Sequence, residues 1–171
     1  KKIKTDTIKS VIINPVKYFI KKYHSKNLLP NELKFMLNCW FPFIANRIRV
    51  KSISENFHRI NVELIYSFWN RNPDKTIWGG CLSSALDPFY QIMLKQIMLN
   101  RGIVTDFYSK SIHVNFIKKV QSNLTLKFRV SEEDADLVQI ELQQNNKYSG
   151  WFHIKGLDSN NNICIEGKVE V

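Results

Sequence analysis

Cysteine is scarce in this chain of 171 residues, and the three that occur, Cys39, Cys81 and Cys164, lie far apart. The sequence has no C-x-x-C motif, and its four histidines are scattered rather than paired. An odd number of distant cysteines argues against a disulfide framework, and these residues offer no recognisable ligand set for structural zinc. We therefore expect no bound metal, and a protein of a reducing compartment, the cytoplasm.

Long hydrophobic runs are also absent, since no apolar run reaches the ~18 residues that a membrane-spanning helix requires. Lysines interrupt each short apolar run near the N-terminus, which argues against a signal peptide. With 44% apolar residues, the chain can build one core but is short for two. We expect a single globular domain, residues 29–171, preceded by a basic helical extension, residues 1–28.

Arginine occurs only six times, and no stretch interleaves it with aromatic residues, which argues against a nucleic-acid partner. The net charge of +10 is concentrated at the N-terminus: residues 1–35 carry nine lysines against Asp6 and Glu32, or +7. The pair Asn14-Pro15 predicts the start of an amphipathic helix that ends near residue 25. A solvated basic face is one interpretation of this helix, and contact with an anionic membrane surface is the alternative.

Hydrophobic periodicity predicts an α+β chain. A helix should begin after Pro30 or Asn31 and end at Pro42, and a second, apolar almost all round and therefore buried, should cover residues 89–99. Strands are expected where apolar and polar residues alternate: 48–50, 60–66, 112–116, 124–130, 151–155 and 164–171.

One further segment, residues 131–144, fits either a helix or a strand. Ser131 and Asp134 form a capping box, which predicts a helix to about Gln144. The alternation of Val138, Ile140 and Leu142 would also fit a strand.

The stretch NRNPDKTIWGGCLSSALDPFYQIML, residues 70–94, departs from these regular patterns. Its flanks read as helix, yet Asp87-Pro88 lies between them, and proline disfavours helical geometry in the residue before it. Pro88 could bend one continuous helix and present Asp87 to a cleft, or Asp87 could cap a new helix that begins at Pro88. A local rule broken inside an element is often a sign of a functional site.

The same stretch resembles the acyl-CoA thioesterases of the hotdog superfamily, in particular the phenylacetate-pathway type. Their pattern N-x-x-G-T-x-H-G-G, with an Asp seven residues later, is matched at five positions: Asn72, Thr76, Gly79, Gly80 and Asp87. The segments N-R-N, T-x-aromatic-G-G and D-P-F-Y resemble more closely a bacterial family of uncharacterised thioesterase-like proteins. The segments LNCWFPFIANRIRV, SKSIHVNF and WF at residues 151 and 152 are similar to that family as well. Trp78 stands where the active enzymes carry His, and Lys75 where they carry Gly.

The resemblance implies an antiparallel sheet wrapped around a long buried helix, here with extra N-terminal helices. It also implies that Asp87 is the nucleophile or general base, acting across a dimer interface. The amides of Gly80 and Cys81 would stabilise the oxyanion at the start of the helix, and Asn72 would position water or the substrate carbonyl.

The remaining members of the motif are candidates for substrate binding. They are Gly79, Trp78, Thr76, Asn70 and Ser84, with the Trp78 ring as a wall of the acyl pocket. Plainer structural roles stay open: a tight turn for Gly79-Gly80, a turn residue for Asn72, and packing for Trp78.

The sequence therefore predicts a thioesterase that hydrolyses acyl-CoA or an acyl-carrier thioester. It needs no cofactor beyond coenzyme A as part of the substrate, and it should assemble as a homodimer or a homotetramer built from dimers. Because Trp78 cannot accept a proton, the alternative is a catalytically silent module that binds an acyl thioester or a lipid. A third possibility is a membrane-surface protein that acts through its basic helix.

Overall fold

The computed structural model describes residues 20–24 and 28–171 of the chain. Residues 20–23 are helical, and the rest of the predicted helix over residues 15–25 lies outside the described residues. Helix α2 spans Pro30–Cys39, so it begins at Pro30 itself rather than after it. The Glu32 side chain accepts the backbone N–H of Leu29 at 2.9 Å, which fixes the start of the helix.

The predicted end of this helix at Pro42 is wrong. The chain leaves α2 at Cys39, and a further helix, α3, spans Phe41–Asn46 with Pro42 in its first turn. Proline is tolerated there because the first N–H groups of a helix need no partner within the helix. Helix α3 matters for the candidate site because it places Phe43 and Asn46 beside the central helices.

The described residues form one antiparallel sheet of six strands in the order β1-β2-β4-β5-β6-β3. The strands are β1 Ile48–Ile53, β2 Arg59–Leu64, β3 Ser111–Phe116, β4 Leu124–Arg129, β5 Trp151–Leu157 and β6 Ile163–Glu170. Each overlaps a segment that alternation predicted. On β2 and β4 the apolar residues are buried on one face, while polar residues occupy the other.

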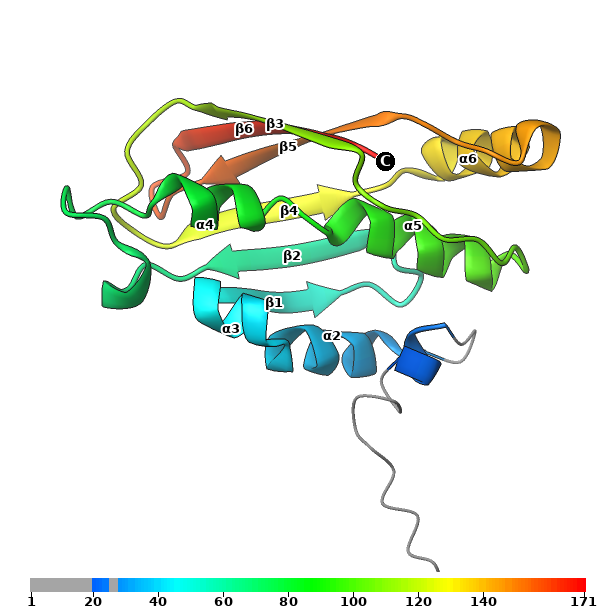
Figure 1. Cartoon of the computed structure of the whole chain (residues 1–171), viewed down its shortest axis with the longest axis horizontal. Coiled ribbons are helices and arrows are strands. Elements are labelled where there is room, and N and C mark those ends of the chain that lie inside the picture. Colours follow the sequence, from blue (N-terminus) through cyan, green and yellow to red (C-terminus); the bar gives the residue numbers. More distant parts are fainter. Residues whose placement is uncertain (1–19, 25–27) are drawn as a thin grey trace, which may run out of the picture.

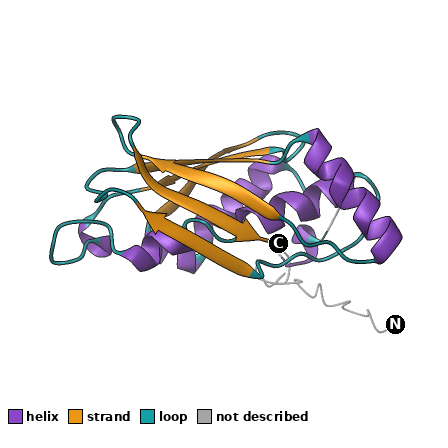
Figure 2. Cartoon of the chain, turned by 90° about the horizontal axis from the view of Figure 1, so that it is seen from above, coloured by secondary structure: helices purple, strands orange, loops and turns teal. Residues whose placement is uncertain are grey.

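The predicted central helix is present in two pieces, α4 Gly79–Ser84 and α5 Phe89–Asn100. Both lie along one face of the sheet (Figures 1 and 2). Ten of the twelve residues of α5 are buried. Its aromatic side chains pack on the sheet: the Phe89 ring lies 4.6 Å from that of Phe128, and Tyr90 stacks on Phe152 at 4.7 Å. This helix therefore forms the centre of the core.

Helix α6 spans Glu132–Asn145, so the capping box decides this segment and the strand alternative is wrong. The Ser131 hydroxyl accepts the backbone N–H of Asp134 at 3.0 Å, which satisfies one of the unpaired donors of the first turn. Among the described helices, none is long and apolar enough to cross a membrane.

Two polar residues of α5, Lys95 and Gln96, are buried, and residues 20–24 supply their partners. The Lys95 ammonium lies 2.8 Å from His24 Nδ1 and 4.7 Å from the centre of the Tyr23 ring, and it also donates to the exposed carboxylate of Asp106. Gln96 donates to the Tyr23 carbonyl at 3.0 Å. These contacts cross the predicted boundary at residue 28, which itself stays a prediction.

The two edges of the sheet differ. At β1, the side-chain amide of Asn38 accepts the N–H of Val50 at 2.8 Å and donates to its carbonyl at 3.0 Å. Helix α2 thus covers that edge and takes up backbone groups that could bind another strand. At β3, the opposite edge, the only strand partner among the described residues is β6.

Candidate functional site

The interruption between α4 and α5 places Asp87 at the surface of the core. Asp87 is half-buried, and the peptide bond to Pro88 is cis. Neither interpretation of the Asp-Pro pair is correct. The helix does not continue through Pro88, and Asp87 does not cap α5, because Pro88 itself occupies the cap position and no side chain caps the helix. The Asp87 carboxylate is therefore not used in a helix cap.

The partner of this carboxylate is Ser109, whose hydroxyl donates to Asp87 Oδ1 at 2.5 Å. Ser109 belongs to the segment that follows α5 and leads into β3. The motif around residue 80 gave no indication of it. The indication that could have found it is SKSIHVNF, the segment with family resemblance that begins at Ser109.

A hollow of about 140 Å³ lies beside Asp87. Its walls come from the central helices, from α3 and from β1: Phe43, Asn46, Ile48, Ser84, Asp87 and Pro88. The predicted substrate-binding residue Ser84 thus shares a hollow with Asp87. The volume is well below the ~300–1,000 Å³ of typical small-molecule sites, so this hollow by itself holds too little space for an acyl chain.

The glycine pair forms the first turn of α4. In the described part of the chain, no group accepts a hydrogen bond from the amides of Gly79 or Gly80. The Cys81 amide, in contrast, donates to the Trp78 carbonyl at 3.1 Å. This corrects the expectation that Cys81 offers a free donor, because its N–H already closes the first turn of the helix.

Two aromatic rings cover the glycines. A Cβ built on Gly80 would collide with the indole ring of Trp78, and one built on Gly79 would lie 3.4 Å from the ring of Phe116. A side chain at residue 80 would force the indole ring out of this position, because the ring occupies the space of a Cβ. Trp78 is 51% exposed and Phe116 57% exposed, so both rings also face outward. Phe116 is the second residue of this site that the motif did not reveal.

The remaining motif residues hold the loop before α4. Asn72 Oδ1 accepts the backbone N–H of Thr76 at 3.1 Å, and Thr76 is buried. Asn70 is buried as well: it donates to the Ile65 carbonyl at 2.9 Å and accepts the N–H of Ser67 at 3.0 Å. The oxygen atoms of both asparagine side chains are thus engaged in local structure.

Lys75, which stands where the related pattern has glycine, adopts a φ of 56°. This is the left-handed region, which glycine enters without the steric cost that a Cβ brings. The glycine of the pattern is therefore explained by backbone conformation, and its replacement by lysine does not remove a chemical group from the site.

Cys81 is buried, and its thiol donates to Asn46 Oδ1 at 2.9 Å. Burial raises the pKa of this thiol, although its hydrogen bond with Trp78 opposes the effect. A neutral, hydrogen-bonded thiol is a poor nucleophile. The geometry therefore leaves Asp87 as the acid–base candidate of this region.

Solved structures that resemble this chain share its fold. A protein from Pseudomonas aeruginosa named as a probable thioesterase is 13% identical, with a TM-score of 0.68 over 83% of this chain and 93% of that one. A protein of unknown function from Chlorobaculum tepidum is 12% identical, with a TM-score of 0.70 over 85% and 96%. The PaaI protein from the phenylacetic acid degradation operon of E. coli is 13% identical, with a TM-score of 0.59 over 82% and 88%. The α+β hotdog fold implied by the sequence resemblance is thereby confirmed.

At these identities the likeness shows the fold, and the activities in the names belong to those proteins. Among curated proteins, none matches this sequence. A match at the family level extends over residues 32–171, which is most of the chain. This chain belongs to the family described as a domain of unknown function, DUF4442.

Proposed function

We propose that this protein hydrolyses acyl thioesters, with Asp87 as general base or nucleophile. The observation that carries the proposal is the position of the Asp87 carboxylate. It lies at the interruption of the central helices, borders a hollow and is held by the Ser109 hydroxyl. A carboxylate in this setting can take a proton from water or attack the carbonyl carbon directly. The hotdog thioesterases among the structural neighbours support this choice of reaction.

The reaction adds water to the thioester carbonyl and breaks the C–S bond, which gives a carboxylic acid and a thiol. Negative charge develops on the carbonyl oxygen in the transition state and must be stabilised by hydrogen-bond donors. The free amide of Gly80 is one such donor in the proposal. Asn72 can contribute only through its amide nitrogen, since its oxygen is engaged with Thr76.

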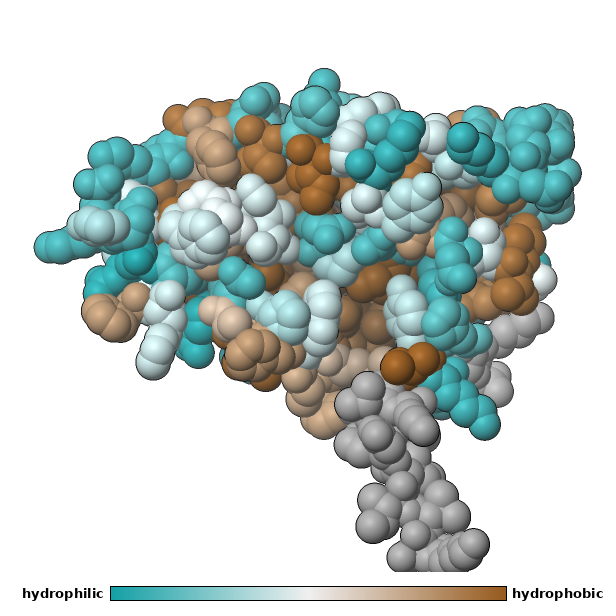
Figure 3. Space-filling view, in the orientation of Figure 1, coloured by the Kyte–Doolittle hydropathy of each residue, from teal (hydrophilic) through white to brown (hydrophobic). Residues whose placement is uncertain are grey.

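The substrate in this proposal is an acyl-CoA or an acyl-carrier thioester, with no further cofactor. Trp78 and Phe116 are exposed rings beside the glycine pair and would contact the acyl chain. Further exposed apolar side chains lie over α3 and over the end of β3, on the side of the molecule seen in Figure 3. They are Phe41, Ile44 and Ile117.

A second copy of the chain would complete the site. The open edge of β3 can pair with another strand, while Asn38 blocks the edge of β1. A dimer formed through β3 would cover the apolar side chains at the end of this strand, beside the glycine pair. We therefore include a homodimer, or a dimer of dimers, in the proposal.

One observation favours the alternative function, binding without turnover. The indole ring of Trp78 lies against Gly80, and the active enzymes carry an imidazole at the position of Trp78. If the ring keeps a substrate carbonyl from the Gly80 amide, the protein would bind a thioester and leave it intact.

The deciding experiment measures hydrolysis of a panel of acyl-CoA thioesters of increasing chain length, together with their binding by calorimetry. Wild-type protein is expected to release free thiol, and Asp87→Asn to bind the same thioesters with turnover reduced at least ~10²-fold. Asp74→Asn, an exposed carboxylate in the loop before α4, is the matched control and should behave as wild type. Binding without hydrolysis by the wild type would support the alternative, and undiminished turnover in Asp87→Asn would exclude Asp87 from the mechanism.

A further inference from the structure

Two arginines occupy directly opposite positions on neighbouring strands, Arg59 on β2 and Arg129 on β4. Side chains in such a pair lie on the same face of the sheet about 5 Å apart at Cβ, and like charges there repel. In the described part of the chain, neither guanidinium group has an ion pair or a side-chain hydrogen bond that would offset this repulsion. An anion that joins the two groups would offset this repulsion.

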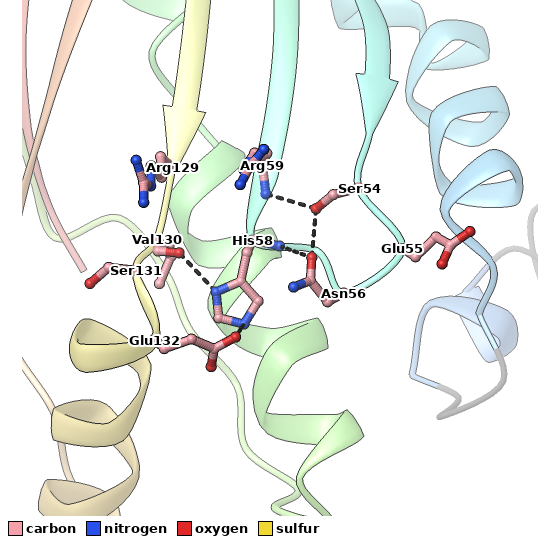
Figure 4. A pocket seen from close by; sticks show the side chains of 9 residues that line it. All are labelled: Ser54, Glu55, Asn56, His58, Arg59, Arg129, Val130, Ser131 and Glu132. Carbon is pink, nitrogen blue, oxygen red and sulfur yellow. Dashed lines mark hydrogen bonds and ion pairs between the residues drawn. The ribbon is translucent and has the colours of Figure 1, made fainter.

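The pair borders a hollow of about 500 Å³, between the turn that joins β1 to β2 and the start of α6. Figure 4 shows the two guanidinium groups at one end of this hollow, and the Glu55 carboxylate pointing away from them. A volume of this size is within the range of sites for small molecules. The hollow shares no lining residue with the one beside Asp87.

Apart from the Glu55 carboxylate, which points away from the arginine pair, the acceptors of this hollow are already used. Asn56 Oδ1 accepts the Ser54 hydroxyl at 2.8 Å, and the Val130 carbonyl is bound by His58 Nδ1 at 2.8 Å. The carboxylate of Glu132 lies 3.4 Å from His58 Nε2 and 3.0 Å from the guanidinium of Arg101, so its charge is compensated outside the arginine pair.

The donors, in contrast, are available. Asn56 Nδ2 has no acceptor among the described residues, and both arginines present free N–H groups. A site that combines two guanidinium groups with an amide donor, and whose acceptors are occupied, is complementary to an anion. Phosphate fits best, because its oxygens accept the paired N–H groups of arginine and its double charge matches two cations.

We propose that this hollow binds the phosphate group of a small phosphorylated molecule between Arg59 and Arg129. The Asn56 amide donates to the same group, and the remainder of the molecule occupies the rest of the hollow. This site does not depend on the proposed thioesterase activity, and its binding can be measured on its own.

The test is isothermal titration with inorganic phosphate and with adenosine monophosphate, at an ionic strength held constant with chloride. Adenosine is the uncharged control. Wild-type protein is expected to bind both phosphates saturably, adenosine monophosphate more tightly, and adenosine not at all. Arg59→Gln and Arg129→Gln should each weaken binding at least ~10-fold, since each removes a charge-assisted contact.

The matched control is Arg49→Gln, which removes an exposed arginine from the neighbouring strand β1 and should leave binding unchanged. Both test positions are exposed, so circular dichroism should show folded variants. Without phosphate at low ionic strength, Arg59→Gln is expected to melt no lower than wild type, because it relieves the repulsion. The proposal is overturned if wild type binds neither phosphate, if it binds inorganic phosphate but not adenosine monophosphate, or if Arg49→Gln weakens binding as much as Arg59→Gln.

Discussion

The side chain of Asn38 pairs with both backbone groups of Val50, as a neighbouring strand would. Val50 is fully buried, so its N–H and carbonyl have no access to water. A single asparagine of α2 thus ends the sheet at β1 and holds this helix against the edge. Among the described residues, β3 at the opposite edge has no strand partner other than β6.

Asn38→Ala is expected to lower the free energy of unfolding by about 1–3 kcal/mol, the usual cost of leaving a buried polar group unsatisfied. Urea denaturation followed by circular dichroism measures this change. Asn160→Ala is the control, because that side chain is exposed in the turn between β5 and β6. Equal stability of the two variants would contradict the role given to Asn38.

Val114→Pro tests the dimer through β3. Val171, just after β6, exchanges both backbone hydrogen bonds with Gly150, and because bonds alternate along an antiparallel strand, Gly167 of β6 also faces β5. Val114 lies opposite Gly167, so the N–H of Val114 points away from β6. Proline at this position removes a donor from the open edge and leaves the ladder to β6 intact. Light scattering at micromolar concentration should show a dimer for wild type and for Val114→Ala, and a monomer for Val114→Pro. A monomeric wild type would remove the composite site from the proposal.

Trp78→His separates the enzyme from the binding module. If Trp78 only contacts the acyl chain, the change should alter chain-length preference more than the rate. If the indole ring is the reason for inactivity, the same change should create thioesterase activity, because it uncovers the Gly80 amide. Rates over the thioester panel distinguish these results, and combination with Asp87→Asn should abolish any activity gained.

Lys95 is expected to couple the N-terminal segment to the core. Deletion of residues 1–24 removes Tyr23 and His24 and leaves the buried ammonium group with Asp106 alone. This should lower the free energy of unfolding by at least about 1 kcal/mol, because the buried Lys95 ammonium loses its contacts with the His24 imidazole and the Tyr23 ring. In a Lys95→Met background the same deletion should cost less. A double-mutant cycle of urea denaturation curves measures the coupling, and additive effects would contradict it.

The pH dependence of stability should show the Lys95–Asp106 pair. The hydrogen bond and the charge of Lys95 hold the pKa of Asp106 below its ordinary value of 3.8. A lowered folded-state pKa contributes stability above pH 3.8, and that contribution is lost as the pH falls through the folded-state value. The difference in melting temperature between wild type and Asp106→Asn should therefore be constant above about pH 5 and shrink below 3.8.

The sequence predicted the elements whose signals are local. Alternation located the strands, and the capping box of Ser131 and Asp134 correctly identified α6. The prediction that a helix ends at Pro42 was wrong because proline can begin a helix as well as end one. Only the spacing of the neighbouring apolar residues could have distinguished these two positions of proline.

The candidate site was predictable only in part, because its partners meet through the tertiary structure. The motif identified Asp87 and the glycine pair, but Ser109 lies 22 positions further along and contacts Asp87 only after the chain turns back over α5. The arginine pair of the second hollow depends on the register of β2 against β4, which hydrophobic alternation does not specify to the residue.

Lys95 also has a consequence for relatives of this chain. A lysine in the middle of an apolar helix is stable only where Tyr23, His24 and Asp106 surround it. Family members that begin after the position of His24 should therefore carry an uncharged side chain at the position of Lys95. Those with a lysine there should carry an aromatic residue at the position of Tyr23 and an acid at that of Asp106. One residue of the central helix would then indicate, from sequence alone, which members have an N-terminal segment bound to their core.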